Sequence, residues 1–111
     1  MGTTLERGYT AQLAAAAAAI YTCPAGTRAR VLKCTACNDT TTAVTFNIYL
    51  VPSGGAADAT TILINTKTLG ANESYTCPEI TGHVLEPADS IHGVASAANQ
   101  VTMALSLVEL T

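Results

Sequence analysis

Four cysteines are the side chains with the greatest potential for chemistry, and their spacing limits what they can do. Cys34 and Cys37 form a CxxC pair, whereas Cys23 and Cys77 stand alone, each directly before a proline. A structural zinc site usually takes two closely spaced ligand pairs, and only one pair is present. A thioredoxin-type CxxC lies between a strand and a helix, whereas this one ends a strand-like run and precedes a turn. The spacing therefore predicts neither a set of metal ligands nor a redox centre.

Disulfide formation is the other reaction that these cysteines could undergo. Four cysteines are enough for two bridges in an oxidising compartment. The apolar segment 13–20 is short and mostly alanine, and it lacks the basic flank of a signal peptide. We therefore expect synthesis in a reducing cytoplasm, with free thiols that pack as small hydrophobic side chains.

The tetrapeptide Tyr-Thr-Cys-Pro occurs twice, at residues 21–24 and at residues 75–78. Tyrosine and threonine favour strands, whereas proline cannot donate a hydrogen bond to a sheet, so strand pairing ends there. Each copy therefore predicts the end of a strand. The similar segments AVTFNIYLV and QVTMALSLV follow the two copies at nearly the same distance. A Greek key that is used twice would give such a repetition.

Side chains suited to catalysis are sparse. The two histidines, His83 and His92, lie on or beside strand-like runs, and no GxSxG, HExxH or P-loop pattern is present. Four carboxylates of the second half offer either a glycosidase pair or solvated turn residues, and we favour the latter: Glu73, Glu79, Glu86 and Asp89. We therefore expect that the chain is not an enzyme and has no catalytic residue, no cofactor and no small-molecule substrate.

Charge is scarce along the whole chain. Only 12% of the residues are charged, the formal net charge is −3, and the five basic residues do not form a cluster. Direct binding of nucleic acid is not expected, because phosphate neutralisation needs clustered Lys and Arg. No apolar run approaches the roughly 20 residues that cross a bilayer, so we expect no membrane contact. A surface this poor in charge favours association with a larger assembly.

Strand patterns fill most of the chain. Residues 31–36 alternate with period two, which places Leu32 with Cys34 and Ala36 and indicates one buried face. Turn signals separate about eight such segments, and no stretch of amphipathic helix intervenes. The sequence thus predicts an all-β, antiparallel, two-sheet sandwich that is jelly-roll-like, with an immunoglobulin-like sandwich as the alternative. The predicted strands are 19–22, 28–37, 43–51, 60–68, 73–77, 83–85, 90–95 and 101–109.

The first thirteen residues show no consistent period and are predicted to form an N-terminal arm, with a single domain at residues 14–111. Within this arm, Leu5, Tyr9 and Leu13 are spaced by four residues. They form either one face of a helix or the anchors of an extended segment that lies on a partner. We predict partner contacts through these three residues and Arg7. The alanines at 14–18 remain open between helix and irregular structure.

Three segments resemble the strand-and-turn motifs of small structural proteins of tailed phages: IYTCPAGTRARVLKCTACNDT, IYLVPSGG and VLEPADSI. The resemblance covers about residues 19–110. In length and character, the chain most resembles the capsid decoration proteins, or molecular staples, of epsilon15-like short-tailed phages.

This resemblance implies a jelly-roll-like domain that is synthesised in the host cytoplasm and located on the outer capsid surface of the virion. There it would form a homodimer and clamp neighbouring subunits of the major capsid protein, which would stabilise the shell. Two alternatives stay open. One is a structural protein of the phage tail, neck or fibre, and the other is a carbohydrate-binding β-sandwich module.

Overall fold

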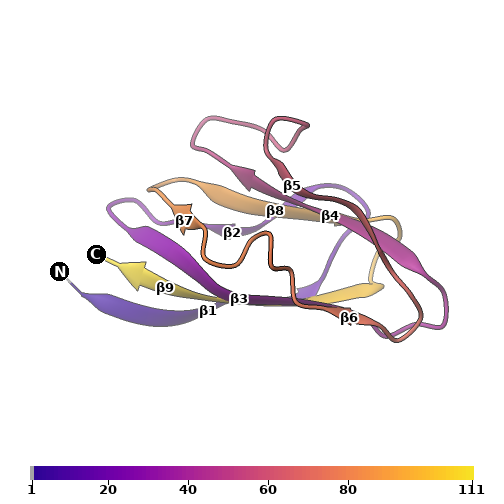
Figure 1. Cartoon of the computed structure of the whole chain (residues 1–111). Coiled ribbons are helices and arrows are strands. Elements are labelled where there is room, and N and C mark those ends of the chain that lie inside the picture. The colour runs from indigo at the N-terminus through magenta and orange to yellow at the C-terminus, as the bar shows by residue number, and fades with distance from the viewer. Residues whose placement is uncertain (1) are drawn as a thin grey trace.

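Two layers of antiparallel strands make up the chain (Figure 1). The structure is a computed structural model that describes residues 2–111, with only the backbone described for residues 6–11. Within this part, the strands are β1 (Thr3–Gln12), β2 (Ala18–Thr22), β3 (Arg28–Asn38), β4 (Val44–Val51), β5 (Ile62–Leu69), β6 (Ser74–Tyr75), β7 (Val84–Leu85), β8 (Ser90–Ala95) and β9 (Val101–Leu110).

The strand order is that of a jelly roll. Sheet A has the order β1-β9-β3-β6, with the short β7 also paired to β3, and sheet B has the order β2-β8-β4-β5. The pairs nest in sequence: β1 with β9, β2 with β8, β3 with β6 and β7, and β4 with β5. With β6 and β7 taken as one interrupted strand, this gives the eight strands of two Greek keys. The predicted all-β, two-sheet sandwich is confirmed, and the order favours the jelly roll over the immunoglobulin-like alternative.

Apolar side chains from both sheets fill the space between the layers. Met103, Leu105 and Leu107 of β9 and Phe46 and Ile48 of β4 are all at most 1% exposed. They occupy every second position of their strands, as the pleat requires when one face is buried. Burial of one such side chain contributes about 1.5–3 kcal/mol, so these two rows hold the sheets together.

The segment predicted as an arm is instead placed in the sandwich. Thr3–Gln12 forms β1, which pairs with β9 along its whole length and is the outermost strand of sheet A. Leu13 then enters the core, where Gly93 makes room for it. A Cβ atom on Gly93 would lie 2.8 Å from Leu13 Cδ2. Residue 13 therefore belongs to the packed core, because the chain crosses between the sheets at this point.

The alanine-rich segment after Leu13 is not helical. Residues 14–17 form a bend between β1 and β2, and their side chains are exposed. The Ala14 carbonyl accepts a hydrogen bond from the Ala95 amide at 2.9 Å, which ties the bend to β8. Residues 2–111 contain no α-helix, and accordingly no helical segment with the length and hydropathy to cross a membrane.

Both copies of the repeated tetrapeptide end a strand, as predicted. β2 ends at Thr22 and β6 ends at Tyr75, and the cysteine that follows each strand is buried: Cys23 is 1% exposed and Cys77 is 0% exposed. The copies lie on the second and sixth strands of the jelly roll, again with β6 and β7 taken as one strand. The segments that follow them at equal distance are β4 and β9, the fourth and eighth strands.

Candidate interaction surface

One row of side chains crosses the outer side of sheet A from edge to edge. Leu5 of β1 pairs with Val108 of β9, Val108 pairs with Arg30 of β3, and Arg30 pairs with Val84 of β7. Paired residues of antiparallel strands point to the same face. Because the neighbours Ala29 and Leu85 are buried, this row faces away from the core. We call the outer side of sheet A at this row and beside it the sheet A face.

Exposed hydrophobic side chains gather on the sheet A face. Among the described side chains, the large hydrophobic ones that are exposed are Leu5 at 76%, Val84 at 53%, Leu110 at 49% and Leu32 at 46%. All four belong to strands of sheet A. A single exposed leucine is ordinary, whereas a cluster on one face is typical of a surface that binds a partner.

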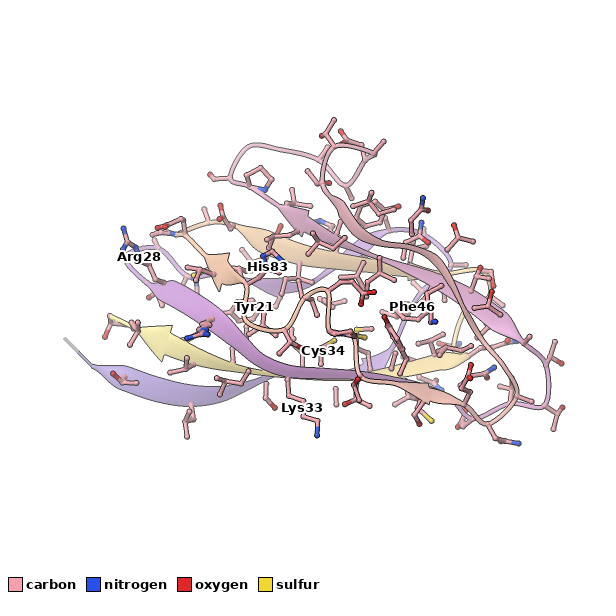
Figure 2. All side chains as sticks on the ribbon, viewed as in Figure 1. Tyr21, Arg28, Lys33, Cys34, Phe46 and His83 are labelled. Carbon is pink, nitrogen blue, oxygen red and sulfur yellow. The ribbon has the colours of Figure 1, made fainter. Side chains whose placement is uncertain are left out.

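Positive charge accompanies these apolar side chains. Arg28, Arg30 and Lys33 are exposed residues of β3 and make up three of the chain's five basic residues. Figure 2 shows Lys33 on the outer side of sheet A and Arg28 at the end of β3. Arg28 Nε lies 2.8 Å from Glu86 Oε2, while Arg30 and Lys33 make no ion pair with any described carboxylate. The face therefore presents two basic side chains, Arg30 and Lys33, that no described carboxylate pairs with, beside its apolar side chains.

A cavity of about 450 Å³ opens where the chain termini meet, at one end of sheet A. Its lining includes Arg28, Pro87 and Leu110. The termini lie side by side there (Figure 1), and the Gly2 amide donates a hydrogen bond to the Thr111 carbonyl at 3.1 Å. The cavity shares Arg28 and Leu110 with the sheet A face, so an apolar group bound to the face could extend into it.

The outer side of sheet B is different in character. Its described residues include no exposed large hydrophobic side chain. Its polar groups bond to one another: Asn47 Nδ2 donates to the Tyr49 hydroxyl at 3.2 Å, and the Thr66 amide donates to Asn47 Oδ1 at 2.7 Å. A depression of about 300 Å³ lies beside Asn47, and its one aromatic lining residue, Phe46, is 1% exposed. It therefore offers no aromatic platform on which a sugar could stack.

The four residues predicted to contact a partner fall in different places. Leu5 lies on the sheet A face. Leu13 is 1% exposed and belongs to the core, so it is not available at the surface. Arg7 and Tyr9 have their backbones in β1, but their side chains lie outside the described part of the structure. Sequence reasoning missed the rest of the row, which pairings between distant strands bring together.

Each carboxylate considered for catalysis takes part in an ion pair or a hydrogen bond. Glu86 pairs with Arg28, and Asp89 accepts a hydrogen bond from the Ser53 amide at 2.9 Å. Glu79 accepts a hydrogen bond from the Tyr75 hydroxyl at 2.7 Å, which raises the pKa of Tyr75 to about 12. The remaining carboxylate, that of Glu73, accepts from the Gly70 amide at 2.7 Å. These contacts fit turn and edge residues that stabilise the sandwich.

The described cysteines, histidines and carboxylates form no metal-binding cluster. No three described His, Cys, Asp or Glu side chains lie close enough together to hold a metal ion. His92 contacts Ser90 Oγ through Nδ1 at 3.3 Å on sheet B. All four cysteines are free thiols.

Comparison of the sequence with protein families and with characterised proteins gives no match. Two solved structures share the fold. A protein of Bacillus endospore appendages, described as a family of disulfide-linked pili, is 17% identical with a TM-score of 0.56. The match covers 98% of this chain and 88% of that protein.

The second solved structure is a protein of infectious bursal disease virus, Gx strain. It is 16% identical to the chain, with a TM-score of 0.50. The match covers 97% of this chain but only 32% of the viral protein. At these identities, the similarities establish a shared fold.

Proposed function

We propose that the chain is a virion structural protein that decorates the outer capsid surface and binds there through the sheet A face. The observation that carries this proposal is the row Leu5–Val108–Arg30–Val84, which leaves apolar side chains in water on one face of a rigid sandwich. The fold shared with a protein of infectious bursal disease virus supports a place in a virus particle.

The proposed partner is the major capsid protein. The chemistry of the sheet A face calls for an apolar site on that protein with carboxylates nearby, because Arg30 and Lys33 lack acidic partners among the described residues. Burial of the exposed apolar area stabilises such a contact by about 25 cal/mol per Å². The shell offers many equivalent sites, so one chain can contact two neighbouring subunits at once. Two modest contacts made together give a much higher overall affinity and hold the subunits to each other.

A homodimer on the capsid is part of the proposal. β1 ends the strand order of sheet A, so one of its edges has no strand partner in the described chain. Such an edge can pair with the same edge of a second copy across a two-fold axis. The dimer would continue sheet A across both copies and double the binding face.

The proposal gives the chain no catalytic role, no cofactor and no small-molecule substrate, and it involves neither nucleic acid nor membrane. The local engagement of the carboxylates in turns and ion pairs supports this view. Scarcity of charge supports it too, since only 12% of the residues are charged.

A second candidate is a subunit of a filament built from this chain alone. The specific observation in its favour is the similarity to the Bacillus appendage protein, which extends over 98% of this chain and 88% of that one. In that case the sheet A face would bind another copy of the chain rather than a capsid subunit.

Sedimentation separates the two candidates. The purified chain is mixed with virus particles from which it has been omitted, and the mixture and the chain alone are centrifuged. We expect the chain alone to stay in solution and the mixture to sediment together, with the loaded shells surviving heating that breaks bare ones. If the chain alone forms filaments and leaves the shells bare, the filament role replaces the capsid role.

A further inference from the structure

Two cysteines that are far apart in the sequence, Cys34 and Cys77, are brought near each other inside the sandwich. β6 pairs with β3 through Cys37 with Ser74 and Ala36 with Tyr75. Cys77 follows Tyr75 by two residues and Cys34 precedes Ala36 by two residues, so these pairs bring Cys77 alongside the part of β3 that carries Cys34. A disulfide spans Cα atoms about 4.4–6.8 Å apart, which is the scale of the spacing of about 4.8 Å between neighbouring strands.

The two thiols lie in the same buried core. Cys34 is 1% exposed and Cys77 is 0% exposed, and both belong to the central hydrophobic cluster. Figure 2 shows Cys34 on the inner side of β3, opposite to the side of Lys33. The hydrogen bond from the Cys77 thiol to the Cys34 sulfur lowers the pKa of Cys34, while the same bond and burial raise the pKa of Cys77. In this pair, Cys34 is the thiol better able to react as a thiolate.

The backbone around Cys77 is shaped to keep the thiol in this place. Cys77 has a φ of 47°, in the left-handed region that normally favours glycine or asparagine. The segment 76–83 then follows the edge of β3, where the Gly82 amide donates to the Val31 carbonyl at 2.8 Å. Ile80 in the same segment is fully buried. A residue held in an unfavourable backbone conformation by its surroundings points to a role for its side chain.

We propose that Cys34 and Cys77 form an intrachain disulfide when the folded or folding chain meets a small-molecule disulfide such as oxidised glutathione. The Cys34 thiolate attacks one sulfur of the small disulfide and releases one thiol, which leaves a mixed disulfide on Cys34. The Cys77 thiolate then attacks the Cys34 sulfur and releases the second thiol. The two protons of the cysteines end on the two released thiols, the cysteine pair is oxidised, and the small disulfide is reduced.

The product is a covalent link between β3 and the segment 76–83. The positions of the other two cysteines prevent them from forming this link. Cys37 lies on the same strand as Cys34 but on its outer side, half-buried. Cys23 contacts the Thr27 carbonyl at 3.2 Å, in the turn that follows β2. The link would form after transfer from a reducing to an oxidising environment, and it would stabilise the jelly roll without changing the sheet A face.

Peptide mapping tests the proposal on the purified chain. The chain is refolded in excess oxidised glutathione, so that burial of the thiols does not limit the reaction, and is digested with trypsin without reduction. Cleavage after Lys33 and Lys67 separates residues 34–67 from residues 68–111. We expect these two peptides to be joined and to have lost two hydrogen atoms. The Cys37→Ala variant assigns the link to Cys34, because it leaves Cys34 as the sole thiol of its peptide.

Thermal unfolding gives the second readout. We expect oxidation to raise the Tm of the wild-type chain and of Cys37→Ala by about 10 °C, because the link closes a loop of more than forty residues. Cys34→Ala and Cys77→Ala should show no such rise. Separate peptides after oxidative refolding, a link through Cys37 or Cys23, or a rise that persists in Cys34→Ala would each overturn the proposal. None of these readouts involves a capsid, so they are independent of the proposed function.

Discussion

On both outer sides of the sandwich, every second side chain of a strand points away from the core. The two sides differ in the kind of side chain that they expose to solvent. On sheet A, the row Leu5–Val108–Arg30–Val84 exposes aliphatic side chains beside Arg30, which makes no ion pair with a described carboxylate. On sheet B, the corresponding row runs from Ala19 through His92 and Tyr49 to Ile62. Most of its side chains are half-buried, and neighbouring polar groups bond to one another.

This difference between the sheets indicates which exposed residues need a functional explanation. Sheet B shows that the outer face of a sheet in this fold can consist of small, polar or half-buried side chains. The fold itself therefore does not require Leu5, Leu32 or Val84 to be apolar, because their side chains add little to the core at 46–76% exposure. The exposed apolar side chains of sheet A are better explained by a partner that covers them.

Adding negative charge to each face in turn should give the largest difference between them. We expect Leu5→Asp combined with Val84→Asp to weaken attachment to shells by at least about 100-fold, because two anchors of the interface are lost and carboxylates are buried unpaired. The matched control adds the same two charges to sheet B, as Ala19→Asp with Thr68→Asp. The control should change attachment by less than about 2-fold, since residues outside an interface contribute little.

Binding isotherms of both double variants on shells measure this difference, with circular dichroism to verify that each variant is folded. If both double variants lost affinity for shells to the same extent, the two faces would not differ in binding. A loss in the sheet B variant alone would assign the contact to the opposite side of the sandwich.

Removal of a single positive charge should have a smaller effect. Arg30→Gln keeps a polar side chain on the sheet A face but removes a positive charge that no described carboxylate pairs with. We expect attachment to fall about 5-fold at low salt and much less at about 0.5 M salt, where screening already weakens the pair. Lys67→Gln is the matched control, because Lys67 lies 4.6 Å from the centre of the Tyr75 ring, away from the sheet A face. If attachment of both variants depended on salt in the same way, the positive charge of Arg30 would not contribute to binding of the shell.

Local patterns in the sequence predicted most of the fold, because alternation and turn residues act over short distances. Eight of the strands lie close to their predicted bounds, and both tetrapeptide copies end a strand. β1 was missed, because a bulge between Arg7 and Tyr9 interrupts the period of two and the spacing of Leu5 and Leu13 suggested a helical face. The bend at 14–17 is likewise set by the crossing between sheets and not by the helix propensity of alanine.

The candidate surface was much less predictable than the strands. Leu5 could be proposed from sequence, whereas its row depends on pairing with strands far along the chain. Leu32 was grouped with Cys34 and Ala36, which are buried, but a bulge between Val31 and Lys33 leaves it exposed. The proximity of Cys34 and Cys77 has the same origin, since it follows from the pairing of β3 with β6 and from no local motif.

A cryo-electron microscopy map of the particle that carries this chain tests the central claim most directly. The measurement needed is the identity of the sandwich face that lies against the neighbouring subunit. The account predicts that density from that subunit covers Leu5, Val84 and Arg30 on sheet A, while Tyr49 and Thr68 on sheet B remain open to solvent. A map in which the neighbouring subunit covers sheet B and leaves the sheet A face bare would contradict it.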